Sequence, residues 1–182
     1  MSRPAQNSNL IIEAMFNLRD REERANTLKT FIIGGTFIMC LWIGLPFLIH
    51  KFIDPVFSSS VSIKPVRWLG MLLSGLGYCL AVWCVMLFIK EGKGTPLPFA
   101  GPKRLIIKGP YRFVRNPMVL GTVLFLIGDS VLLGSAGIFI YAIAVFAVMH
   151  IFILVEERSL LKRFGTEYSS YYDKTPRWCP KF

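Results

Sequence analysis

The sequence predicts an all-α, polytopic membrane protein with about four transmembrane helices, of which the last two form a C-terminal helical hairpin that continues into an amphipathic cytoplasmic helix. Two observations predict this class. Of the 182 residues, 53% are hydrophobic and only 18% are charged, which is too apolar for an ordinary soluble domain. The apolar residues also gather into four long runs, separated by polar or turn-forming segments, as in helices that cross a bilayer.

The first 27 residues form a polar N-terminal segment of mixed charge. Its apolar residues, between Leu10 and Leu18, recur roughly at helical spacing, which indicates either a short helix on the membrane surface or a disordered tail. The polarity of the segment gives no sign of a cleavable signal peptide.

The first two spans are predicted at residues 28–49 and 65–89. Pro46 should kink the end of the first span, and the segment 50–65, with two prolines and three consecutive serines, is typical of a loop. The second span carries small residues at positions i, i+4 and i+7. They are Gly70, Ser74 and Gly77. Small side chains let a neighbouring helix approach closely, so this stripe is interpreted as a packing surface.

The segment 90–115 is the most basic loop of the chain, with seven basic residues against the single acid Glu91. Repeated glycines and prolines between residues 92 and 102 forbid a regular helix there, so the segment should form an irregular lobe at the membrane surface.

The third and fourth spans are predicted at residues 118–133 and 138–155, joined by an uncharged tight turn. Asp129 lies near that turn and is interpreted as an interfacial residue rather than a catalyst. The apolar face of the fourth span continues at helical spacing beyond the bilayer, to a predicted end near Gly165.

The basic residues predict the topology and the partners. All but three of the 21 Lys and Arg residues lie before or at the start of the first span, in the 90–117 lobe or after the fourth span, which places both termini and the lobe in the cytoplasm. The formal charge of +10 arises from residues between apolar runs, so anionic lipid is the expected partner and nucleic acid is not. The four cysteines lack metal-ligand spacing, and no metal site is expected.

The segment GPYRFVRNPMVLG, at 109–121, leads directly into the third span. Pro117 suits the first turn of a helix, and Asn116 is a candidate N-cap. Arg112 and Arg115 then lie close to the positive end of that helix, where two guanidinium groups and two aromatic rings suit an anionic, planar ligand. The alternative is that these arginines are interfacial anchors beside lipid headgroups.

The topology brings a second polar pair to the same membrane face. Glu156 and Glu157 lie where the fourth span leaves the bilayer, at the cytoplasmic end of the hairpin, so they should come near Arg112 and Arg115. Such a cluster is either a polar pocket with apolar walls or a set of interfacial salt bridges worth about 0–1 kcal/mol each.

Two sequence blocks together resemble the isoprenylcysteine carboxyl methyltransferase family and its phospholipid methyltransferase relatives. The blocks are GPYRFVRNPMVLG and, about 35 residues later, EERSLLKRFGTEYSSYYDKTPRWCP. The preceding GKGTPLPFAGPKRLIIKG is similar to the lead-in of bacterial members. The resemblance covers roughly residues 90–180 and implies a membrane-embedded methyltransferase that uses S-adenosylmethionine, in the inner membrane of a bacterium. The chain would then comprise an N-terminal segment (1–27), two transmembrane helices (28–89) and a cofactor-binding core (90–182).

Carried over residue by residue, the resemblance implies a site with two walls. Arg115 and Glu157 are the pair expected nearest the reaction, either orienting a carboxylate acceptor or taking a proton from an amine. The residues expected to bind the cofactor are Tyr111, Arg112, Asn116, Pro117, Gly121, Glu156, Leu160, Tyr168 and Tyr172. Carboxylates and aromatic faces suit the sulfonium and ribose of such a cofactor, and arginine suits its carboxylate.

The sequence departs from the family at two positions and leaves the acceptor open. Asn116 stands where many members have histidine, and Val119 stands where a tyrosine is expected. A prenylcysteine carboxylate and a phospholipid amine both fit a lipid-facing slot. Two other functions also remain: a membrane oxidoreductase related to sterol reductases, with a nicotinamide cofactor, and a non-catalytic basic membrane protein. The oligomeric state is open.

Overall fold

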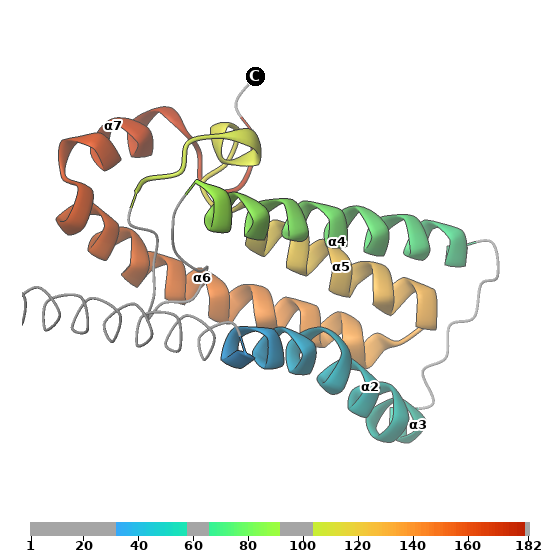
Figure 1. The fold of residues 1–182 in the computed structure, drawn as a ribbon. Coiled ribbons are helices and arrows are strands. Elements are labelled where there is room, and N and C mark those ends of the chain that lie inside the picture. Colours follow the sequence, from blue (N-terminus) through green and yellow to red (C-terminus); the bar gives the residue numbers. More distant parts are fainter. Residues whose placement is uncertain (1–31, 58–65, 92–103, 181–182) are drawn as a thin grey trace, which may run out of the picture. The chain divides into compact units, whose positions relative to one another are not determined.

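The computed structural model describes residues 32–57, 66–91 and 104–180, and these contain helices and no β-strand (Figure 1). Three helices are long and apolar enough to cross a membrane, and a fourth, shorter helix is also apolar. They are Ile32–Val56, Arg67–Lys90 (α4), Ala136–Phe164 (α6) and the shorter Pro117–Leu133 (α5). The predicted class, an all-α integral membrane protein, is confirmed. The predicted N-terminal segment and most of the basic lobe, residues 92–103, lie outside the described residues.

The first span ends later than the sequence predicts. From Cys40 its helix continues through four short elements, the second of which contains Pro46: η1 (Cys40–Gly44), α2 (Leu45–Leu48), η2 (Ile49–Ile53) and α3 (Asp54–Phe57). Both η elements are π-helical turns, and at the end of the first the Leu45 N–H donates to the carbonyl of Cys40, five residues back. Wide turns of this kind accommodate a proline, which has no N–H to donate, within a continuous helix. The prediction of a loop from residue 50 is therefore wrong for residues 50–57.

Helices α4 and α5 lie side by side along their length (Figure 1). The contact is made by glycines on both helices: Gly70 faces Gly128 and Leu132, and Gly77 faces Gly121. A Cβ atom on Gly70 would stand 2.5 Å from the backbone nitrogen of Leu132. The two backbones touch because no side chain separates them, which confirms the packing role predicted for the small-residue stripe.

A polar link crosses the same contact. The Ser74 hydroxyl donates to Oδ1 of Asp129 at 2.7 Å and also lies 3.2 Å from the carbonyl oxygen of Phe125. Asp129 is half-buried between the helices. Its carboxylate thus has a partner within the bundle rather than only at the membrane interface.

Helices α5 and α6 form the predicted hairpin. Gly134 ends α5 in the left-handed conformation, with φ 66°, and the Ser135 side chain accepts a hydrogen bond from the Ile138 N–H to cap α6. Helix α6 runs without interruption to Phe164, as predicted. At Gly165, with φ 54°, the chain turns into α7 (Thr166–Lys174).

Within residues 32–57, 66–91 and 104–180, the buried side chains form two small clusters. One cluster joins Cys84 of α4 to Ile106 and Tyr111, and a second joins Leu126 of α5 to Ala142 and Val145 of α6. Many large apolar side chains on the same helices stay exposed, among them Trp68, Trp83, Ile140, Ile143 and Ile151. In an integral membrane protein these side chains face lipid, so they need no protein partner.

Candidate active site

The site lies where the N-terminal end of α5 meets the end of the chain. The turn η5 (Gly109–Arg112) and residues 113–116 lead into α5, and the residues after α7 run beside them (Figure 1). Two hydrogen bonds tie the segments together: the Arg115 N–H donates to the carbonyl of Pro176 at 2.9 Å, and the Tyr171 hydroxyl donates to the carbonyl of Tyr111 at 2.7 Å. Blocks more than 50 residues apart in the sequence thereby share one site.

Glu157 is the centre of this site. It lies on α6, is only 7% exposed, and contacts two guanidinium groups. Oε1 of Glu157 is 3.3 Å from Nη1 of Arg115. Arg177 binds both oxygens, with Nε donating to Oε1 at 3.1 Å and Nη2 donating to Oε2 at 2.6 Å. The expected meeting of Glu157 with Arg115 is confirmed, whereas Arg177 was not predicted as a partner.

Arg115 is buried but incompletely paired. Its side chain is 8% exposed, and its guanidinium carbon lies 3.7 Å from the centroid of the Tyr172 ring, which is a stacking contact. Nε and Nη1 are nevertheless buried without a hydrogen-bond partner, since the 3.3 Å contact with Glu157 lacks hydrogen-bond geometry. A buried donor left unpaired costs about 1–3 kcal/mol, so these N–H groups indicate that an acceptor belongs beside Arg115.

Asn116 behaves differently from its predicted role as an N-cap. It occupies the N-cap position of α5, but its side chain makes no capping hydrogen bond. Its Nδ2 is instead buried without a partner, next in the chain to Arg115. Consecutive residues therefore carry buried N–H groups without a hydrogen-bond partner, on the Asn116 amide and on the Arg115 guanidinium.

Buried tyrosines line the α7 side of the site. Burial raises the pKa of Tyr168 to about 12, and the nearby Glu157 carboxylate contributes to the same shift. Burial likewise raises the pKa of Tyr171 and holds that of Tyr111 well above its usual range. The Tyr171 hydroxyl donates to the Tyr111 carbonyl, whereas the protonated Tyr168 hydroxyl is able to donate a hydrogen bond within the site.

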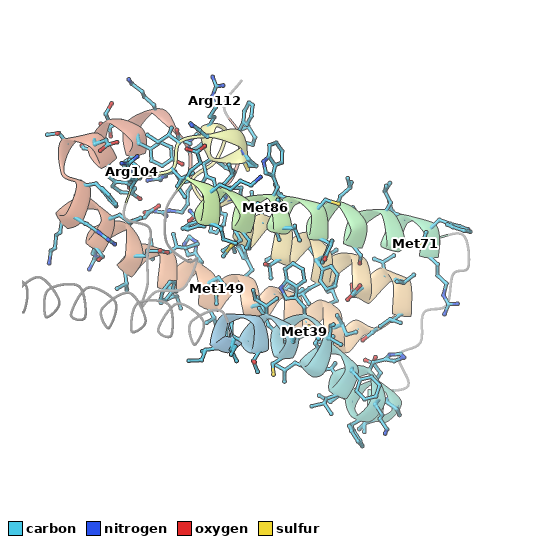
Figure 2. The ribbon with its side chains drawn as sticks, in the orientation of Figure 1. Met39, Met71, Met86, Arg104, Arg112 and Met149 are labelled. Atoms are coloured by element: carbon cyan, nitrogen blue, oxygen red, sulfur yellow. The ribbon has the colours of Figure 1, made fainter. Side chains whose placement is uncertain are left out.

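The other residues expected at the site are distributed around it. Arg112 is exposed on η5 (Figure 2), and neither it nor Glu156, which is half-buried, forms an ion pair with the described residues. Pro117 is buried at the first position of α5, and Leu160 is half-buried on α6. Gly121 packs against the backbone of α4 at Ala81, one turn further along α5. The structure thus brings Arg115, Glu157, Tyr168 and Tyr172 together. Arg112 lies at the outer side of this site, and Gly121 lies in the contact between α4 and α5.

A group of three aromatic side chains next to this site was not predicted. Phe146 and His150 of α6 contact the Trp178 ring, with centroid distances of 4.9 Å and 5.7 Å respectively. We call these three residues the aromatic cluster. The label of Met149 in Figure 2 marks this level of α6. Nδ1 of His150 and Nε1 of Trp178 are both buried without a hydrogen-bond partner.

A sequence signal for the aromatic cluster exists in retrospect. Positions 146, 150 and 157 recur at spacings of four and seven, so Phe146 and His150 share one helix face with Glu157. Arg177 and Trp178 are consecutive, and they reach Glu157 and His150 respectively, which are two turns apart on α6. Among the described residues, no group of three or more His, Cys, Asp or Glu side chains is placed to hold a metal ion.

Comparison with known proteins covers the part of the site that lies on α5 and α6, whereas Tyr168, Tyr172, Arg177 and Trp178 lie beyond the matched residues. The phospholipid methyltransferase family matches residues 65–167, which is more than half of the chain and includes α4, α5 and α6. No curated protein matches the sequence.

Proposed function

Since the chain belongs to the phospholipid methyltransferase family, we propose that it transfers a methyl group from S-adenosylmethionine to a lipophilic acceptor at the cytoplasmic face of the membrane. Membership of the family implies methyl transfer to a lipid-like molecule, and the apolar helices make the protein an integral membrane protein. The cofactor, the side of the membrane and the inner membrane of a bacterium as its location are parts of the proposal. The distribution of basic residues supports the cytoplasmic orientation of the site and of both termini.

The observation that carries the proposal is the buried, incompletely hydrogen-bonded guanidinium of Arg115 beside the carboxylate of Glu157. The methionine part of the proposed cofactor has one carboxylate and one ammonium group. Unpaired N–H groups on Arg115 and Asn116 fit a carboxylate, and the half-buried carboxyl group of Glu156 fits an ammonium. The residues present therefore fit the cofactor, and when bound it would supply an electrophilic methyl group on a sulfonium.

Arg115 and Glu157 then act by position. Both oxygens of Glu157 contact guanidinium groups, so neither is free to act as a strong proton acceptor. Arg115 is held from three sides: its backbone by Pro176, its charge by Glu157 and its plane by Tyr172. We assign this pair to holding the reacting groups in line, which is the main contribution of a protein to a displacement reaction.

The proposal retains the other residues that were predicted to bind the cofactor. The surroundings of each residue suggest its role. The protonated Tyr168 hydroxyl is a donor, Tyr172 fixes the plane of Arg115, and Leu160 offers apolar contact. Tyr111, Pro117 and Gly121 hold the wall of the site through core and helix contacts. Arg112 and Glu156 add charge at its margin.

Calorimetry on the detergent-purified protein tests the proposal directly. S-adenosylhomocysteine should bind with measurable heat, and NADPH should not. Heat with NADPH alone would identify a membrane oxidoreductase, and heat with neither would identify a non-catalytic protein. Incubation with radiolabelled S-adenosylmethionine and a total lipid extract should then place the label in a lipid product. Absence of labelled lipid would overturn the proposed reaction.

A further inference from the structure

Two arginines share one buried carboxylate in the candidate active site. Glu157 is 7% exposed, and its oxygens lie 3.3 Å from Nη1 of Arg115 and 2.6 Å from Nη2 of Arg177. Among the described residues, neither arginine forms an ion pair with any other carboxylate. The charge of Glu157 therefore balances only one of the two guanidinium groups. Because an uncompensated charge at a buried site is costly, this excess indicates that an anionic group of a ligand belongs here.

The two arginines use Glu157 unequally. Arg177 binds it as a fork, with Nε donating to Oε1 at 3.1 Å and Nη2 donating to Oε2 at 2.6 Å. Arg115 approaches the same Oε1 without hydrogen-bond geometry, and its Nε and Nη1 have no hydrogen-bond partner. A guanidinium and a carboxylate prefer the forked arrangement, and Glu157 can offer it to one arginine at a time. By occupying Glu157, Arg177 keeps the N–H groups of Arg115 available.

Arg115 is held in a position that presents those N–H groups. Its backbone N–H donates to the carbonyl of Pro176 at 2.9 Å, and its guanidinium carbon lies 3.7 Å from the centroid of the Tyr172 ring. The Arg115 side chain is 8% exposed, whereas that of Arg177 is 24% exposed. Arg115 is therefore the inner guanidinium, which suits contact with a ligand. Arg177 is the outer one, and its side chain reaches Arg115 through Glu157.

We propose that Arg177 is a positioning residue that gives the candidate active site its preference for ligands with a free α-carboxylate. This inference rests on the proposed function, in which Arg115 and Asn116 receive the carboxylate of the methionine part of the cofactor. In this role Arg177 acts without touching the ligand. It holds both oxygens of Glu157, so that Glu157 does not form a fork with Arg115. Without Arg177, Arg115 turns to Glu157, and the ligand carboxylate loses its partner.

Calorimetry with two matched ligands tests this role without requiring turnover. S-adenosylhomocysteine and its decarboxylated analogue differ only in the α-carboxylate. The full-length, detergent-purified protein should bind S-adenosylhomocysteine more tightly by a factor of about 10–100, which is the contribution of a hydrogen bond to a charged group. We call this ratio of affinities the carboxylate preference. Equal affinity of the wild-type protein for both ligands would overturn the inference.

Replacing Arg177 should remove most of the carboxylate preference. Arg177→Gln should bind S-adenosylhomocysteine about 10-fold more weakly and should bind the decarboxylated analogue as the wild-type protein does, because only the carboxylate loses a partner. Arg177→Lys keeps the charge but not the fork, so its preference should lie between those of Arg177→Gln and the wild type. Arg158→Gln, at an exposed position beside Glu157, is the matched control and should keep the wild-type preference.

A merely structural role for Arg177 predicts a different result, since a loosened site would weaken both ligands equally. Equal weakening of both ligands in Arg177→Gln, or an unchanged carboxylate preference, would overturn the proposal. Thermal unfolding without ligand reports whether this variant folds. Where it does not fold, Arg177→Lys decides the question by the same two criteria.

A second background tests the route through Glu157. Glu157→Gln removes the carboxylate for which the two arginines compete. Adding Arg177→Gln to this variant should therefore change the carboxylate preference by less than about twofold, because two residues that act as a unit are not additive. The same loss in both backgrounds would show that Arg177 acts on the ligand directly, and would overturn its role as a positioning residue.

The failure of this inference is distinguishable from the failure of the proposed function. If S-adenosylhomocysteine binds and lipid is labelled while Arg177→Gln keeps the wild-type preference, only the role of Arg177 is wrong. If S-adenosylhomocysteine gives no heat and no lipid is labelled, the proposed function is wrong as well.

Discussion

Arg177 binds Glu157 through two parallel hydrogen bonds of 3.1 Å and 2.6 Å, which makes a residue near the end of the chain a structural part of the site on α6. The Arg177 pKa is raised by these hydrogen bonds to Glu157, so the guanidinium stays charged. The segment after α7 is therefore held by charge to α6 at Glu157 and by ring contact at His150. These two contacts hold the segment after α7 against the end of the hairpin where Glu157 lies.

Replacing Arg177 should weaken the protein more than the loss of an exposed charge. Arg177→Ala removes a charge-assisted pair from the buried Glu157, and we expect a loss of about 1–3 kcal/mol, measured as a lower midpoint of thermal unfolding in detergent. Arg177→Lys should recover only part of this, because an ammonium cannot form the two-pronged contact. Arg158→Ala, an exposed position beside Glu157, is the control. Equal midpoints for Arg177→Ala and Arg158→Ala would contradict the prediction.

Arg115→Ala and Glu157→Ala should each abolish methyl incorporation while the protein remains folded. Each change removes one partner of the central ion pair and leaves the other partner able to reorganise toward Arg177 or Tyr172. The measurements are radiolabel incorporation and the elution profile of the detergent complex. Retained turnover in both variants would remove the pair from the proposed reaction. Arg163→Ala, an exposed site on the same helix, should keep wild-type turnover.

The transmembrane architecture could be predicted from the sequence because it depends on the average hydrophobicity of long segments and not on single residues. Apolar length predicts a span, and the small residues Gly70, Ser74 and Gly77 predict close packing whatever the partner is. The partner surface, Gly121 and Gly128 on α5, was not identified as the opposing stripe. Its spacing of seven is clear only when two helices are aligned, and alignment depends on tertiary structure.

The candidate site was predicted in part for a related reason. Arg115 and Glu157 lie at the two ends of a hairpin with a tight turn, so their meeting follows from the topology. Arg177, Trp178 and His150 were missed because α7 and the turn at Gly165 reverse the chain, and no periodicity predicts where a reversed segment lands. His150, within an apolar run, also gives no local pattern.

Gly77→Ala should be much more destabilising than Gly75→Ala. A Cβ on Gly77 would meet the backbone of Phe125 and Gly121, which is unable to move aside without separating α4 from α5. A Cβ on Gly75 meets nothing within 4 Å. We expect Gly77→Ala to cost several kcal/mol, and Gly75→Ala to be neutral or to stabilise α4 by about 0.5–1 kcal/mol through helix propensity. Thermal midpoints of the two variants provide the comparison, and equal shifts would argue against backbone contact.

Tyr168 predicts a loss of stability in alkaline solution. Burial raises its pKa from 10.0 to about 12 in the folded protein, so between these values the unfolded chain loses the proton first. The stability due to Tyr168 is therefore complete below pH 10 and is lost as the pH rises toward 12, by at most about 1.4 kcal/mol per pH unit. In Tyr168→Phe the unfolding midpoint should fall less steeply across this window. Tyr111 and Tyr171 titrate in the same direction, so part of the slope should remain. An unchanged slope would show that the pKa of Tyr168 is the same in the folded protein as in the unfolded chain.

Asp54 links the first span to the start of α6. Its variants distinguish the stability that comes from the hydrogen bond to its oxygen atom from the stability that comes from its charge. Oδ1 accepts a hydrogen bond from the Gly137 N–H at 3.1 Å, and Oδ2 lies 2.9 Å from Nδ1 of His50. The first contact satisfies a free N–H in the opening turn of α6, which is worth about 0.5–2 kcal/mol for a capping side chain. The second involves an exposed histidine, and exposed pairs contribute about 0–1 kcal/mol.

Asp54→Ala should therefore lower the unfolding midpoint clearly, whereas Asp54→Asn, which keeps an oxygen toward Gly137, should lower it slightly. His50→Gln should behave like Asp54→Asn, because it alters the same exposed contact. Thermal unfolding of the three variants under identical detergent conditions measures these differences. If Asp54→Asn were as unstable as Asp54→Ala, charge rather than hydrogen bonding to α6 would be the source of the stabilisation. The hydrogen bond from the Gly137 N–H to Asp54 would then contribute little to stability.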